Sequence, residues 1–139
     1  MIWLPYAVGI VLGILVAAFL RSVGFDRDRA VYPTILIVIA LYYVLFAVMG
    51  GSVAALGIEL IGLIVFALVA VLGFARNPWW IVAGLSGHGA FDSVHSRLIA
   101  NPGVPAWWPA FCGSIDVCLA ACLAVLLLQG RLRSRRTPL

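Results

Sequence analysis

Residues 52–74 read SVAALGIELIGLIVFALVAVLGF, an apolar run in which Glu59 is the only charged residue. About 20 such residues allow an α-helix to cross the hydrocarbon core of a bilayer. Four further segments meet the same test, at about residues 2–20, 32–50, 79–99 and 107–129. We therefore predict an all-α integral membrane bundle of five transmembrane helices, a single domain over residues 1–139 that ends in a basic cytoplasmic tail at 130–139.

The composition of the whole chain supports this class. Hydrophobic residues make up 65% of the sequence and charged residues only 10%, whereas about half of a soluble domain is apolar. The first residues, Met-Ile-Trp-Leu-Pro-Tyr, lack the basic segment that opens a cleavable signal peptide, so we interpret them as part of the first helix. We expect a multi-pass protein, located in a bacterial inner membrane.

The arginines predict how the bundle is oriented. In a five-helix arrangement only Arg97 falls on one side of the membrane, and cytoplasmic loops are the ones that retain positive charge. The N-terminus is therefore predicted outside and the C-terminus inside. We interpret the basic tail as a topology signal that touches anionic lipid headgroups, and we expect no nucleic-acid partner. The arginines on the inner side are Arg21, Arg27, Arg29, Arg76, Arg131, Arg133, Arg135 and Arg136.

Ionisable residues inside the predicted helices are the main sign of function. Of the five carboxylates in the chain, Asp26 and Asp28 lie in an arginine-bearing loop. The other three and both histidines lie within membrane segments, where charge is costly and usually marks a site. These residues are Glu59, His88, Asp92, His95 and Asp116.

Three of these residues share one face of the helix predicted at 79–99. At about 100° per residue, His88, Asp92 and His95 fall within roughly 60° of one another. The neighbouring residues Gly89 and Ala90 are small, so that a partner helix or a substrate can come near this face. We expect this helix, which is rich in small residues, to occupy a central position.

The depths of the polar residues coincide. With a rise of ~1.5 Å per residue, Glu59, Asp92 and Asp116 lie about 10 to 13 Å below the outer ends of their helices. Tyr42 and Tyr43 reach a similar layer. Residues from four helices are therefore expected to meet in one site in the outer half of the membrane.

The residue types predict a metal-dependent enzyme. Two imidazoles with carboxylates suit zinc or another divalent transition metal. We expect His88, Asp92 and Asp116 as metal ligands, Glu59 as the general base and His95 as a second proton carrier or a fourth ligand. The reaction expected is hydrolysis of a membrane lipid or another apolar molecule by a metal-activated water.

Two other classes of function remain open from the sequence. The same residues could form the path of a proton- or metal-ion-coupled transporter or channel subunit, which would need to form a homo-oligomer because five helices enclose little space. Alternatively, the chain could be an accessory subunit whose polar residues form a structural hydrogen-bond network, although each such bond contributes only about 1 kcal/mol in a membrane.

The positions of the histidines argue against haem, and the cysteines add little. Haem with two histidine ligands needs them on opposite faces of the ring, and His88 and His95 share one helix face, so we expect no haem. The three cysteines, Cys112, Cys118 and Cys122, contain no CxxC pair and are expected to be small buried apolar residues. Cys112 precedes Asp116 by four residues, and so it is a weak candidate for an additional soft ligand.

Two local patterns predict backbone geometry. Asn101-Pro102-Gly103-Val104-Pro105 has proline and glycine at the central positions of a type II turn, which predicts a stiff outer loop that either covers a cavity or simply joins two helices. Gly9, Gly13 and Ala17 recur every four residues, a spacing that lets helix backbones pack closely.

Motifs between residues 87 and 117 carry a resemblance. Gly87-His88-Gly89-x-x-Asp92-x-x-His95, followed by Asn101-Pro-Gly-Val-Pro-x-Trp-Trp-Pro-x-Phe-Cys112 and by Ser114-Ile-Asp116-Val, resembles a family of small bacterial and fungal polytopic membrane proteins of unassigned function. The resemblance implies that the five ionisable residues are signature positions. A looser similarity exists to membrane hydrolases of the alkaline ceramidase and progestin-receptor type, which place zinc-binding histidines and an aspartate within helices but have more helices and a third histidine ligand, in a different order.

Overall fold

The computed structural model describes residues 2–132, which form five α-helices and one short 3-10 helix. The predicted all-helical class is confirmed, and the helix boundaries lie within about three residues of the predicted ones. Positions 133–139, most of the predicted basic tail, lie outside the described residues. The elements are α1 (Leu4–Val23), η1 (Phe25–Arg27), α2 (Val31–Met49), α3 (Val53–Ala75), α4 (Trp79–Leu98) and α5 (Trp108–Leu128).

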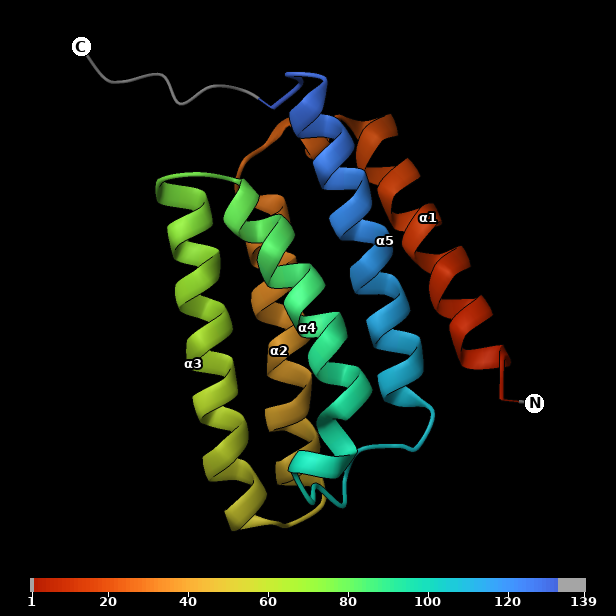
Figure 1. Ribbon diagram of the computed structural model, residues 1–139, viewed down its shortest axis with the longest axis vertical. Coiled ribbons are helices and arrows are strands. Elements are labelled where there is room, and N and C mark those ends of the chain that lie inside the picture. Colours follow the sequence, from red (N-terminus) through yellow and green to blue (C-terminus); the bar gives the residue numbers. More distant parts are fainter. Residues whose placement is uncertain (1, 133–139) are drawn as a thin grey trace.

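The helices run alternately up and down side by side (Figure 1). By length and composition, α1, α2, α3 and α5 can cross a membrane, the pattern of a multi-pass membrane protein. The remaining described α-helix, α4, has 20 residues, as many as α1, but its polar residues lower its hydropathy. It packs against α2, α3 and α5, as its small residues predicted.

Short-range signals set the helix ends. Gly24 ends α1 with φ of 86°, a left-handed conformation in which glycine costs least. Ser52 caps α3, because its hydroxyl accepts a hydrogen bond from the Ala55 N–H. At the start of α4, the Asn77 Oδ1 accepts from the Trp79 N–H at 3.1 Å. These caps position α3 and α4, the helices that carry four of the five ionisable residues.

The glycines of α1 let it lie directly on α5. A Cβ atom added at Gly9 would lie 2.4 Å from the backbone oxygen of Phe111, and one at Gly13 would lie 2.8 Å from Cys118 Cβ. Neither distance is possible between real atoms, so the close approach requires glycine at both positions. The predicted small-residue contact is confirmed, and α5 is its partner.

The turn after α4 differs from the predicted type. The Val104 N–H donates to the Asn101 carbonyl at 3.2 Å, so a turn is present at the predicted position. Type II geometry is nevertheless wrong, because Gly103 does not have the positive φ that it requires. Glycine is needed there for space, since an added Cβ would lie on the Phe46 carbonyl oxygen.

The interior changes character along the bundle. Towards the end that holds the α1–α2 connection, the core is apolar and includes Leu36, Leu85, Leu119 and Leu123. Towards the other end the buried residues include the ionisable side chains of α3, α4 and α5. Large apolar side chains cover the outside of the helices, as they do in proteins that face lipid.

Candidate functional site

The five ionisable residues predicted to form the site are all inside the protein. Each side chain is at most 2% exposed. They come from α3, α4 and α5 and form two neighbouring groups, described separately below. They are Glu59, His88, Asp92, His95 and Asp116.

The first group, which we call the four-residue cluster, consists of His88, Asp92, Cys112 and Asp116. One possible ligand atom from each residue lies within 4.8 Å of all the others. His88 Nδ1 is 2.7 Å from Asp116 Oδ2 and 3.7 Å from Asp92 Oδ2. Three of these residues are predicted ligands, and the fourth is the cysteine expected to share the face of Asp116.

Helix geometry and two glycines create the four-residue cluster. His88 and Asp92 are four residues apart on α4, and Cys112 and Asp116 are four apart on α5, so each pair projects from one face. The two helices can approach because a Cβ on Gly89 would already lie 3.1 Å from the Gly113 carbonyl oxygen. The small residues therefore bring the two ligand pairs together.

The donor set of the four-residue cluster fits a divalent transition metal. Among the described residues, Asp92 Oδ2 and Asp116 Oδ1 are buried and have no hydrogen-bond partner, which is rare for polar atoms inside proteins. Imidazole, thiolate and carboxylate are the ordinary ligands of zinc. Two ligand atoms of one tetrahedral zinc lie about 3.3 Å apart. The distance of 2.7 Å between His88 Nδ1 and Asp116 Oδ2 must therefore increase slightly when an ion binds.

The second group, which we call the dyad, is Glu59 and His95. Glu59 Oε1 lies 2.7 Å from His95 Nε2 and accepts a hydrogen bond of 2.9 Å from Asn101 Nδ2. Both contacts are satisfied when Glu59 is ionised and His95 carries its hydrogen on Nε2, which leaves Nδ1 as the proton acceptor of the ring. A carboxylate that fixes the tautomer of a histidine in this way is a common feature of acid–base sites.

Tyr43 of α2 connects the two groups. Its hydroxyl donates a 2.5 Å hydrogen bond to Asp92 Oδ1. Its ring stacks on His95, with centroids 4.0 Å apart and an angle of 24° between the planes. Tyr42, expected in the same layer, is instead 38% exposed and packs on Trp108, because adjacent residues of a helix point in different directions.

Asn101 was not recognised in the sequence as a site residue. It lies in the loop after α4, where its position before proline and glycine indicated only a turn. Its Nδ2 also donates to the Tyr43 carbonyl at 3.0 Å, and its Oδ1 accepts from the Gly103 N–H. The amide thus joins the loop to α2 and to Glu59, a long-range contact that has no local sequence signal.

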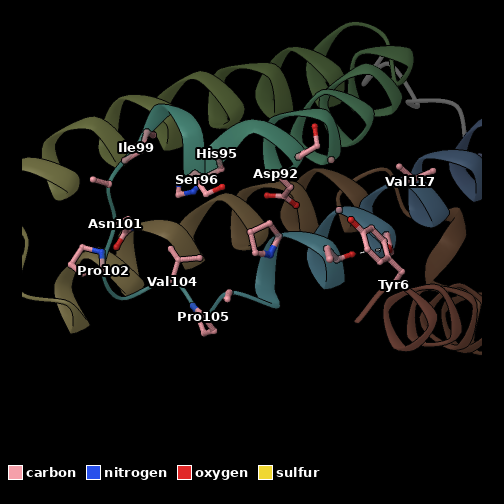
Figure 2. Close-up of a pocket in the computed structure, with 18 of the residues that line it drawn as sticks. Tyr6, Asp92, His95, Ser96, Ile99, Asn101, Pro102, Val104, Pro105 and Val117 are labelled. Carbon is pink, nitrogen blue, oxygen red and sulfur yellow. Dashed lines mark hydrogen bonds between the residues drawn. The ribbon is translucent and has the colours of Figure 1, made fainter. Parts of the chain in front are cut away.

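A cavity of about 1160 Å³ adjoins both groups. Figure 2 shows Asp92 and His95 extending from α4 towards it, with the loop of Asn101 and Pro105 at one end and Tyr6 of α1 at the other. Glu59 does not line this cavity, since it lies on α3 beyond His95. The serine hydroxyls at its wall are those of Ser52, Ser93, Ser96 and Ser114.

The rim of the cavity includes residues on the outer surface of the bundle. Tyr6 and Ile10 of α1 are 43% and 45% exposed, and Val117 of α5 is 57% exposed.

Comparison of the chain with protein-family models, curated proteins and solved structures gave no significant match. Any functional conclusion therefore depends on the geometry of this site.

Proposed function

We propose that this protein is a metal-dependent integral-membrane enzyme that hydrolyses a lipid or another apolar substrate. The observation that carries the proposal is the pairing of a buried four-residue cluster, which has two unpartnered carboxylate oxygens, with a histidine–carboxylate dyad beside the same cavity. Metal hydrolases combine an ion that activates water with a nearby group that moves protons.

Charge supports an ion in the four-residue cluster. Asp92 and Asp116 contribute two negative charges when ionised and a Cys112 thiolate a third, and a divalent cation compensates two of these three charges in a region where uncompensated charge is costly. His88 and Cys112 complete a mixed nitrogen, sulfur and oxygen set, which favours zinc over magnesium or calcium. When bound, the ion would supply Lewis acidity and activate water.

We assign Glu59 and His95 roles that differ from those expected from the sequence, in which Glu59 is the general base. His95 lines the cavity and has Nδ1 available, so it is the residue that accepts and returns a proton. Glu59 contacts His95 and Asn101 but does not line the cavity, and it therefore acts as a positioning residue that fixes the imidazole tautomer.

The cavity favours an amphipathic substrate. Its rim includes lipid-facing residues of α1 and α5, whereas its interior wall carries Asp92, His95 and serine hydroxyls. An apolar chain can therefore enter from the bilayer while a polar group reaches the dyad. A pocket of this size holds a lipid-sized molecule.

We also propose that the chain crosses the membrane five times, with the N-terminus outside. α4 is as long as α1 and lies alongside the other helices, and the arginine-bearing connections lie together at one end of the bundle (Figure 1). A bacterial inner membrane is the location that we propose. In intact cells, an impermeant thiol reagent should label Ala100→Cys and not Ser22→Cys; the reverse pattern contradicts this orientation.

An ion- or proton-translocating role is less well supported. A path through the protein needs polar groups on both sides of the site. Between the four-residue cluster and the arginine-rich end, the buried layer is apolar and contains Leu36, Leu85, Leu119 and Leu123. A site that opens on one side favours an enzyme.

The first experiment measures zinc bound to the purified protein by elemental mass spectrometry after loading and removal of excess ion. We expect about one zinc per chain, and at least a tenfold weaker affinity for His88→Ala and Asp92→Asn. His95→Gln is the matched control, because His95 lies outside the four-residue cluster, and it should retain zinc. Absence of zinc from the wild-type protein removes the metal-dependent mechanism.

The second experiment measures hydrolysis of a fluorogenic long-chain ester in mixed micelles. Glu59→Gln should retain zinc but lose at least about a hundredfold in turnover, because an amide cannot stabilise the protonated His95. Turnover equal to that of the wild type excludes the dyad from catalysis. Loss of zinc in Glu59→Gln shows instead that the dyad belongs to the metal site.

A further inference from the structure

A second cavity lies at the arginine-rich end of the bundle. Its volume is about 370 Å³, and its walls come from α1, η1, α2 and α5. Leu119 and Leu123 separate it along α5 from Asp116 and the four-residue cluster. The residues that matter for its chemistry are Arg21, Asp26, Tyr32 and Cys122.

One carboxylate oxygen of Asp26 lacks a hydrogen-bond donor from the described residues at this cavity. Its side chain is only 2% exposed, and Oδ1 is buried without a hydrogen-bond partner among residues 2–132. Within the same part of the chain, no arginine nitrogen lies within 4.0 Å of its carboxylate. A buried carboxylate oxygen without a hydrogen-bond donor is unfavourable, because it has lost its water partners and gained no replacement. The missing donor can be supplied by a ligand in the cavity that Asp26 lines.

The other residues that line the cavity indicate which further groups such a ligand contains. Arg21 stands at the exposed last turn of α1 and offers a positive charge to a phosphate. Ile14 and Val125 line the cavity and are 55% and 48% exposed on the lipid-facing surface, so an apolar chain can continue from the cavity into the bilayer. The cavity therefore combines a buried anion, a cation at its edge and an apolar exit.

We propose that this cavity binds a membrane phospholipid with a primary ammonium headgroup, of the ethanolamine type. The ammonium group donates to Asp26, the phosphate lies against Arg21, and an acyl chain follows the surface between α1 and α5 near Ile14 and Val125. A primary ammonium carries three N–H donors, whereas a choline headgroup has none and a glycerol headgroup has no positive charge. The site therefore selects among lipids by their headgroup and does not depend on the metal-dependent function.

The test compares lipids that have identical acyl chains. The full-length protein in detergent is mixed with phosphatidylethanolamine, phosphatidylcholine or phosphatidylglycerol, and the bound lipid is measured by native mass spectrometry together with the melting temperature. We expect a preference of about tenfold for phosphatidylethanolamine, the size that one charge-assisted hydrogen bond provides. Equal retention of the three lipids overturns the proposal without the need for any variant.

Two substitutions locate the site. Asp26→Asn should abolish the preference and leave zinc binding unchanged. Asp28→Asn is the matched control, since Asp28 is exposed on the same loop and its Oδ1, which accepts from the Ala30 N–H, is retained as an amide oxygen. An unchanged preference in Asp26→Asn contradicts the proposal.

A different occupant gives a different result. If Arg133, Arg135 or Arg136 supplied the donor to Asp26 instead, replacing these three arginines by glutamine would lower the melting temperature, and Asp26→Asn would lower it by a similar amount. Added phosphatidylethanolamine would then have no selective effect on the wild-type protein. That combination overturns the lipid proposal in favour of the C-terminal segment.

Discussion

The Tyr43 hydroxyl donates a 2.5 Å hydrogen bond to Asp92 Oδ1, although the two residues are 49 positions apart in the chain. The same tyrosine stacks on His95, so one side chain of α2 touches a member of the four-residue cluster and a member of the dyad. The position of Asp92 relative to His95 is therefore set by α2 as well as by α4. This relationship provides a direct test of whether the two groups act together.

Replacement of Tyr43 by phenylalanine should remove the hydrogen bond and keep the stacked ring. We expect ester turnover to fall by about tenfold to a hundredfold, because Asp92 loses a buried donor, while zinc remains bound. Tyr42→Phe is the adjacent control and should stay within about twofold of the wild type, since no hydrogen bond of the Tyr42 hydroxyl to a described residue is seen. Equal effects of the two variants contradict a role for the Tyr43 hydroxyl.

Cys112 should be visible as a metal ligand. In the cobalt-substituted protein, a thiolate bound to the ion gives a charge-transfer absorption band in the near ultraviolet, and Cys112→Ser should lose this band. Cys122→Ser, at the other end of α5, should keep it because Cys122 lies outside the four-residue cluster. A cobalt spectrum without that band in the wild-type protein shows that the cysteine is only a neighbour.

Asn101 should affect both stability and turnover. Asn101→Ala removes the donor to Glu59 and to the Tyr43 carbonyl, so we expect a loss of about 1–3 kcal/mol in unfolding free energy and a lower turnover. Asn77→Ala removes a helix cap and should cost about 1 kcal/mol without changing the turnover of the folded enzyme. If both variants change stability alone, Asn101 has no part in positioning the dyad.

The contact between α1 and α5 can be tested with glycine substitutions. Gly9→Ala places a Cβ against the Phe111 carbonyl oxygen and should destabilise the protein by about 1–3 kcal/mol, because backbone must move. Gly62→Ala, in a part of α3 where nothing lies within 4 Å of the added atom, should stabilise it by up to about 1 kcal/mol. Reversible unfolding in mixed detergent micelles measures both changes, and a stabilising Gly9→Ala would contradict the packing.

Hydropathy and helix periodicity were sufficient to predict the helices. The cost of unpaired backbone groups in lipid restricts an apolar chain of this kind to helices, and apolar runs such as 52–74 are long enough to cross a bilayer. The same periodicity places His88, Asp92 and His95 on one face, which is the buried face of α4. These features depend only on neighbours in sequence, and that is why the sequence alone determined them.

The division of the polar residues into two groups was decided by tertiary structure. Spacing along α4 does not distinguish His88, which meets Asp116 of α5, from His95, which meets Glu59 of α3. The choice depends on which helix lies on each side of α4, and the glycine contacts between α4 and α5 contribute to it. Likewise, only the fold brings Asn101 to Glu59 and leaves Asp26 buried beside a cavity, because contacts over long sequence separations follow from helix packing and leave no local pattern.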